Sequence, residues 1–234
     1  MALERLSSDT NRLSQRAAES IRRAIREGRL SAGELYSVAG LAEEFGISRT
    51  PVREALLVLE RQGMVRFERN RGVRVLETTV HDIEEIFALR LLLEVPATAR
   101  ACRRLNLNGL NTIRRELQSM RRTAEADDEA RFMSHDRRFH ELILAATGND
   151  RLVSIVGNLR DHVTSRGPST VGRSRSLQAV LTEHDAIMEA LEGSDAQRAA
   201  AAMREHILTT GRLLVEQQGG GDDRVSWAEW SAPS

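Results

Sequence analysis

The chain has 234 residues, of which 41% are apolar and only 3% aromatic, and its formal net charge is zero. This length allows one large or two small domains with a buried core. So few aromatic residues argue against a base-stacking platform and against a β-sandwich rich in Tyr and Trp. Because no apolar run reaches 18 residues, no signal peptide is visible and Cys102 is the only cysteine, we expect a soluble cytoplasmic protein with no membrane partner.

The charge is unevenly distributed along the chain. Residues 1–76 contain 14 Arg and 10 acidic residues, so this part carries a charge of +4, and the remainder balances it. A basic first part on a neutral chain is a mild indication of nucleic-acid binding.

The first elements predicted from the sequence are helices. In "LSQRAAESIRRAIREGRL" apolar residues recur at helical spacing until the glycine of this segment. The segment "LAEEF" predicts a short helix, and Gly46 allows a tight turn after it. A second helix follows, which Ser48 or Thr50 can cap and which tolerates Pro51 in its first turn, and it ends at Gly63.

The apolar period then changes from 3.6 to 2. The segments "MVRF" and "GVRV" alternate apolar and basic residues on either side of "ERNR", which predicts a small hairpin with Gly72 at the return. The order of helix, helix–turn–helix and hairpin predicts a winged helix–turn–helix domain over residues 1–76.

Beyond residue 77 only helices are predicted, so the expected fold class is mainly α. Six of them form a helical domain over 77–217, in which Pro96 should kink the first helix unless a break occurs there. Residues 218–234 are predicted to be a disordered tail, in which Trp227 and Trp230 are the only unusual feature. The expected helices are 80–104, 108–126, 129–147, 150–165, 172–192 and 195–217.

The first turn of the second helix has the composition of a recognition helix. Small polar and basic residues stand where such a helix meets base edges, and the opposite stripe is apolar. The tip of the hairpin adds a basic residue and a glycine that can approach a phosphate backbone. The alternative is a helical hairpin with a solvated basic face. The candidate DNA-binding residues are Ser48, Arg49, Thr50, Arg53, Arg71 and Gly72.

The stretch "LAEEFGISRTPVREALLVLERQGMVRFERNRGVRV" resembles the DNA-binding domain of GntR-family transcription regulators over about residues 10–76. The resemblance implies that the six candidate residues contact a double-stranded DNA operator with an inverted repeat, bound by a homodimer. Some relatives carry an additional Arg contact two residues before "LAEEFG", where this chain has Ala39.

Three histidines lie on separate predicted helices, at or beside the apolar face: His140, His184 and His206. Asp136 precedes His140 by one turn and shares its side of the helix, whereas His135 points about 100° away. These four residues could converge on a divalent metal, with zinc preferred and nickel, manganese or iron possible. The alternatives are ordinary hydrogen-bonded histidines and a simple intrahelical Asp–His pair.

Residues 80–217 resemble the FCD effector domain of GntR-type regulators, with "DRRFHELI", "EHDAIMEAL" and "MREHI" matching its Asp and His helices. The helix count is closer to the six-helix VanR-like subgroup. The resemblance implies a metal at Asp136, His140, His184 and His206 on the floor of a ligand cavity. Arg90 and Arg160 are expected to bind a small carboxylate effector there, and the alternative for either is a surface salt bridge with Glu94 or Asp161.

The main hypothesis is therefore a homodimeric transcription regulator, most simply a repressor, that responds to a small carboxylate at the metal site. A second hypothesis is a metal-dependent enzyme with a DNA-binding-like first domain, but "DRRFH" has no general-base Glu of the kind found in HExxH enzymes. A third is a regulator whose metal is purely structural.

Overall fold

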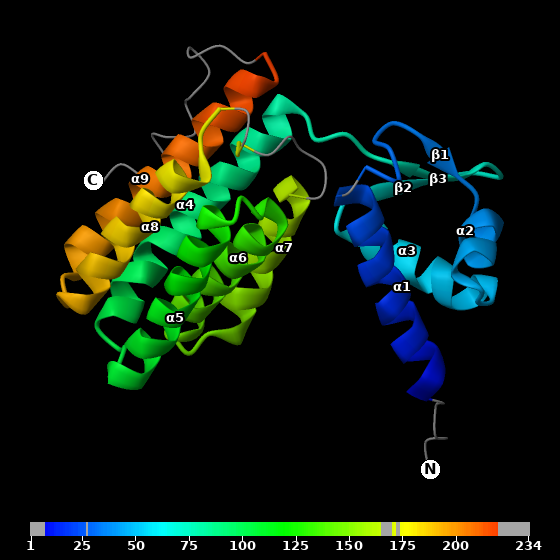
Figure 1. Cartoon of the computed structure of the whole chain (residues 1–234). Coiled ribbons are helices and arrows are strands. Elements are labelled where there is room, and N and C mark those ends of the chain that lie inside the picture. Colours follow the sequence, from blue (N-terminus) through cyan, green and yellow to red (C-terminus); the bar gives the residue numbers. More distant parts are fainter. Residues whose placement is uncertain (1–7, 27, 165–169, 172–173, 220–234) are drawn as a thin grey trace. The chain divides into compact units, whose positions relative to one another are not determined.

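The computed structural model of the chain describes residues 8–26, 28–164, 170–171 and 174–219 (Figure 1). The described part is mainly helical and contains one small sheet. The main division into two compact units falls between Thr78 and Thr79. The end of the chain that the sequence predicts to be disordered, with Trp227 and Trp230, lies outside the described residues from 220 onward.

The first unit is a winged helix–turn–helix, as predicted. Its sheet has the order β1-β3-β2 with antiparallel pairs. The third strand was not expected from the sequence, because a strand of two residues is too short to show a period of 2. The elements are α1 (Ser8–Arg26), β1 (Leu35–Tyr36), α2 (Val38–Phe45), α3 (Arg49–Arg61), β2 (Val65–Glu68) and β3 (Gly72–Val75).

The core of this unit holds α3 in place through the buried face of that helix. Val52, Leu56 and Leu59 are fully buried on its inner face and pack among residues of α1, α2 and the sheet. Gly46 ends α2 in the left-handed conformation that favours glycine. Ser48 occupies the N-cap position of α3, but its side chain makes no capping hydrogen bond, so the expected cap is absent.

The hairpin between β2 and β3 differs in one detail from the prediction. Asn70, not Gly72, takes the left-handed conformation at the return, with a φ of 58°. Gly72 is the first residue of β3 and pairs with Glu68. A Cβ at Gly72 would lie 2.2 Å from the carbonyl oxygen of Tyr36, so this position admits only glycine without a backbone shift.

The second unit consists of six described helices, in agreement with the prediction. Ser176 caps α8, which therefore begins five residues later than expected, and α4 continues through Pro96 without a break. Thr79 and Asp82 form a capping box at the start of α4. The helices are α4 (Val80–Cys102), α5 (Leu107–Glu125), α6 (Glu129–Ala145), α7 (Asp150–Thr164), α8 (Leu177–Glu192) and α9 (Ala196–Gln217).

Packing within this bundle turns one face of α6, α8 and α9 inward. Helix α4 packs against α9 and α6, α8 packs against α9, and α5 packs against α6 and α8. Phe87, Phe132 and Phe139 are among the largest fully buried side chains. No helix in the described part of the chain is long and apolar enough to cross a membrane.

Candidate metal centre and nucleic-acid interface

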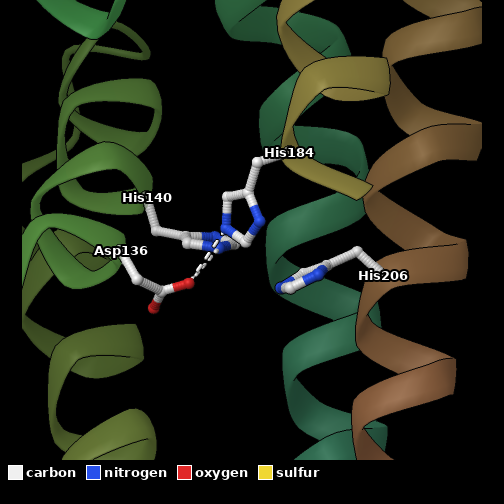
Figure 2. Close-up of side chains that lie close together, drawn as sticks. All are labelled: Asp136, His140, His184 and His206. Atoms are coloured by element: carbon white, nitrogen blue, oxygen red, sulfur yellow. Dashed lines mark ion pairs between the residues drawn. The ribbon is translucent and has the colours of Figure 1, made fainter. Parts of the chain in front are cut away.

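Four polar side chains meet in the interior of the second unit (Figure 2). Asp136 and His140 project from α6, His184 from α8 and His206 from α9, and one potential ligand atom of each lies within 4.8 Å of the others. All four residues are at most 4% exposed. The structure therefore brings together the four residues that the sequence singled out.

The helices present these side chains because the polar positions share a face with apolar core residues. Phe139 and Ile143 flank His140 and are fully buried, as is Ile187 one turn after His184. The Phe139 ring stands edge-on to the His184 ring, with centroids 5.1 Å apart. Apolar side chains thus help to bury the four polar groups, and an unsatisfied polar atom in such a place costs about 1–3 kcal/mol.

Each of the three histidines uses Nδ1 for a contact outside the cluster. His140 Nδ1 lies 3.2 Å from Glu94 Oε2, and His206 Nδ1 lies 2.7 Å from Glu183 Oε2. His184 Nδ1 lies 2.8 Å from the carbonyl oxygen of Val180. Carbonyl and carboxylate oxygens accept hydrogen bonds, so Nδ1 carries the proton in each ring and Nε2 is left with a lone pair.

The surroundings favour neutral imidazoles beside an ionised carboxylate. Burial, reinforced by the charge of Arg160, lowers the pKa of His140 to about 3. Burial also holds the pKa of His206 well below its ordinary value, and the neighbouring His184 adds to the effect. Burial alone would raise the pKa of Asp136, but the charge of Arg160 holds it well below the usual range.

Two of the ring nitrogens lack the hydrogen-bond partner that a buried polar atom usually has. Nε2 of His140 and Nε2 of His184 are buried and make no hydrogen bond. His184 Nε2 does lie 2.9 Å from Asp136 Oδ1, but the direction of the ring bond does not suit an N–H···O bond. A lone pair facing a carboxylate oxygen at this distance is stabilised by a cation between them.

The donor set suits a divalent metal such as zinc, which takes imidazole nitrogen and carboxylate oxygen. Tetrahedral ligand atoms that stand about 2.0–2.2 Å from zinc lie about 3.3–3.6 Å from one another. The ligand atoms of the cluster lie within 4.8 Å of one another. Side-chain movements of about 1 Å would therefore close the set around one ion.

Arg90 and Arg160 lie beside this cluster. Arg90 Nε donates to Glu94 Oε1 at 2.6 Å, and Arg160 donates to Asp136 Oδ2 and stands 3.9 Å from Glu94 Oε2. The expected alternative for Arg90, a surface pair with Glu94, is wrong in one respect, because both side chains are at most 5% exposed. The arginines, Glu94 and Asp136 carry a summed charge of zero.

The open hollow of about 680 Å³ in this unit lies elsewhere. It is lined by α4 around Pro96 and by the turn between α6 and α7. None of the four cluster residues contributes to it, and neither Arg90 nor Arg160 does. The cavity over the metal that the family resemblance implied is therefore not this hollow.

His135 lies outside the cluster, as predicted. Its Nδ1 is 2.8 Å from Glu116 Oε2 near the surface. Three residues around the cluster were missed as candidates: Glu94, Glu183 and Arg175. Glu94 had been considered only as a salt-bridge partner, four residues after Arg90. Glu183 and Arg175 give no signal in the sequence, because their relation to His206 depends on how α8 and α9 pack.

In the first unit the predicted DNA-binding residues line an exposed face. Ser48, Arg49, Thr50 and Arg53 are all exposed on or before the first turns of α3. Ala39 on α2 adjoins three of them in a shallow hollow. The opposite face of α3 is buried, so this helix presents the polar surface that a recognition helix needs.

The hairpin stands beside this face. The Arg53 guanidinium lies over the Phe67 ring, 5.4 Å from its centroid, so a residue of β2 supports a candidate base contact. Arg71 is exposed at the tip and pairs with Glu68 at 3.0 Å. Phe67 was another residue that the sequence did not single out.

Comparison with known proteins decides the family. The profile "Bacterial regulatory proteins, gntR family" matches residues 13–75, and the profile "FCD domain" matches residues 85–209. The chain belongs to the GntR family of bacterial regulators with an FCD domain. This GntR-family protein is thus a DNA-binding transcription regulator, and its family is not one of enzymes.

Individual relatives agree with this assignment. The gluconate operon transcriptional repressor of Bacillus licheniformis is 28% identical over 186 residues, which cover 77% of this chain and 76% of that protein. The regulator LutR of Bacillus subtilis is 28% identical over 81% of this chain and 95% of its own. The Escherichia coli McbR/YncC structure shares the fold with a TM-score of 0.77, at 22% identity over 88% of this chain and 98% of that one.

Proposed function

We propose that this regulator is a metabolite-responsive repressor that binds an inverted-repeat operator as a homodimer, through Ser48, Arg49, Thr50, Arg53, Arg71 and Gly72. Its effector is a small carboxylate, bound at a divalent metal in the FCD domain. The single observation that carries the proposal is the convergence of Asp136, His140, His184 and His206 in a chain that also exposes a recognition helix. A repressor is favoured because the Bacillus relative is named as one.

The four side chains of the cluster would hold the ion, with zinc as the best candidate. When bound, the ion would supply a positive charge to which a carboxylate oxygen of the effector could bind. Asp136 and the three imidazoles contribute a single negative charge, which leaves a positive excess at the centre. With each group counted once, a divalent ion, the two arginines, Glu94 and Asp136 sum to a charge of +2, and this excess favours an anionic effector.

Arg160 is the better placed of the two arginines to contact such an effector. It already bridges toward both Asp136 and Glu94, and its side chain is 13% exposed, whereas that of Arg90 is 5% exposed. A carboxylate could accept two hydrogen bonds from its guanidinium. Ligand binding would then alter DNA affinity only if the two arrangements of the dimer bind the carboxylate differently.

A purely structural metal is the second candidate. Complete burial of four protein ligands is typical of closed structural zinc sites. In that case chelation would lower the melting temperature, and no carboxylate would alter DNA binding.

The deciding experiment measures binding of the metal-loaded protein to labelled DNA from the region upstream of its own gene. A panel of small mono-, di- and hydroxycarboxylates is then added. A sequence-specific complex that one of these acids weakens supports the proposal. A complex that no acid perturbs, together with a metal-dependent melting temperature, leaves the structural role. No specific complex would contradict the proposed operator.

A further inference from the structure

The contacts of the three cluster histidines are unequal. His184 Nδ1 lies against the carbonyl oxygen of Val180 on its own helix, so α8 itself fixes that ring. His140 and His206 depend instead on side chains from other helices, Glu94 of α4 and Glu183 of α8. Of these two carboxylates, that of Glu183 accepts hydrogen bonds from Arg175 at both of its oxygens.

We propose that Glu183, held by Arg175, is a positioning residue that fixes His206 for metal binding. This inference rests on the proposed function, because it assumes that the cluster takes up a metal. It assigns a task to two residues that themselves lie outside the ligand set.

Arg175 also binds the Glu183 carboxylate that faces His206. Its Nη1 donates to Oε1 of Glu183 at 2.7 Å and to Oε2 at 2.8 Å. Its Nη2 donates to Thr210 Oγ1 at 2.8 Å, and its Nε donates to Thr170 Oγ1 at 3.1 Å. The Arg175 side chain is only 9% exposed, and all three of its nitrogens are engaged.

The same network anchors the helix that carries His206. Thr210 Oγ1 donates to the carbonyl oxygen of His206, one turn earlier on α9, at 2.8 Å. Arg175 therefore locates the Glu183 carboxylate relative to the backbone of His206 as well as to its ring. A ring held at both its backbone and its Nδ1 has little rotational freedom left.

The chemical consequence concerns Nε2 of His206. A carboxylate that accepts from Nδ1–H fixes the proton on Nδ1, so that Nε2 keeps its lone pair and becomes a stronger donor to a metal. Loss of such a partner typically weakens metal binding by about 10–100-fold. If Glu183 and Arg175 served only to join α8 to α9, their loss would lower the stability of the bundle. It would not change how strongly His206 binds a metal.

The test compares full-length wild type with Glu183→Ala, Glu183→Gln and the control Glu116→Ala. The control removes the carboxylate of a His Nδ1–Glu pair with nearly the same distance, 2.8 Å at His135, that lies outside the cluster. Affinity for Zn²⁺ is measured by competition with a chromophoric chelator. Co²⁺ loading reports the ligand geometry through its visible absorption spectrum, and melting of the metal-free proteins monitors folding.

We expect Glu183→Ala to weaken Zn²⁺ binding about 10–100-fold and to alter the Co²⁺ spectrum. Glu183→Gln keeps an oxygen acceptor and so should lie between Ala and wild type, while Glu116→Ala should match wild type. Equal Zn²⁺ affinities and spectra for wild type and both Glu183 variants would overturn this inference and leave the metal site standing. A wild type that takes up no metal would overturn both.

Discussion

His184 Nε2 lies 2.9 Å from Asp136 Oδ1, and both side chains are at most 5% exposed. The two residues come from different helices, α8 and α6, and their burial keeps bulk water from screening their interaction. Because Val180 holds the proton of His184 on Nδ1, the contact joins a lone pair to a negative oxygen. The folded bundle therefore holds two electron-rich atoms side by side in its interior, an arrangement that a cation between them would stabilise.

Replacing a cluster residue should reduce bound metal. Asp136→Ala, His140→Ala, His184→Ala and His206→Ala each remove one of four ligands, so we expect the metal content of the purified protein to fall from about one ion per chain. Elemental analysis after dialysis measures this directly. His135→Ala is the matched control on the same helix and should retain the ion, since His135 faces Glu116. Equal metal in all five variants would refute the assignment.

Metal removal should destabilise the protein. An ion that binds only the folded chain stabilises it by about 4 kcal/mol when its free concentration is 1,000 times Kd. Chelation of wild type should therefore lower its melting temperature, while Asp136→Ala should melt at the same temperature with and without the chelator. A chelator effect that persists in Asp136→Ala would mean that the metal is bound elsewhere.

Acid should destabilise the metal-free protein from about neutral pH downward. The pKa of His140 is lowered to about 3 in the folded chain, from 6.5. Between these values the unfolded chain binds the proton and the folded chain does not, so the free energy of unfolding falls as the pH falls from about 6.5 to 3. Urea unfolding at a series of pH values in a chelator measures the slope.

The matched comparison for this pH dependence is His140→Gln against His81→Gln. His140→Gln removes one of the two buried histidines whose pKa is lowered and should make the slope between pH 3 and 6.5 shallower. His81 is exposed, so its replacement should leave the slope as in wild type. A His140→Gln slope as steep as that of wild type would show that this histidine is not the group that titrates.

The exposed face of α3 should control operator affinity. Arg53→Ala removes a cation that stands over Phe67, and we expect a loss of about 1–3 kcal/mol in binding to the cognate operator. Fluorescence anisotropy at fixed salt measures the affinity. Arg114→Ala makes the same charge change on α5, where Arg114 pairs with Glu192, and should bind like wild type. Similar losses for both variants would contradict a specific role of Arg53.

Gly72→Ala should disrupt the small sheet. The added Cβ would meet the carbonyl oxygen of Tyr36 at 2.2 Å, and the φ of 128° is itself unfavourable for alanine. Gly46→Ala is the control, because its φ of 63° costs about 1–2 kcal/mol but its Cβ meets nothing within 4 Å. Hydrogen exchange of the amides in β1–β3 should accelerate much more in Gly72→Ala. Equal protection in the two variants would exclude the clash.

Gly72 also illustrates which structural features a local sequence pattern can predict. The alternation in "MVRF" and "GVRV" was enough to predict the hairpin, because period 2 needs only four residues to appear. The close approach of β1, which is what demands glycine, involves a partner more than thirty residues earlier in the chain. No local pattern contains it, so Gly72 was assigned only to the return of the hairpin and to DNA contact.

The cluster of four candidate metal ligands shows the same limit of prediction from sequence. His140, His184 and His206 could be singled out because each interrupts an apolar face, and Asp136 because it shares the side of His140. Their supporting partners could not, since Glu94 and Glu183 reach the rings across helix interfaces whose rotation the sequence does not specify. Helical period determines which face a residue occupies, and packing alone determines which atoms meet across it.

The packing of α4 against α9 has a consequence for the order of synthesis. The core of the DNA-binding unit lies wholly within residues 17–75, whereas the cluster needs His206, midway along the last described helix. At about 5–20 residues per second, ribosomes need about 7–26 seconds to cover that interval. The winged helix–turn–helix unit can thus fold on the nascent chain before all four residues of the cluster have been synthesised.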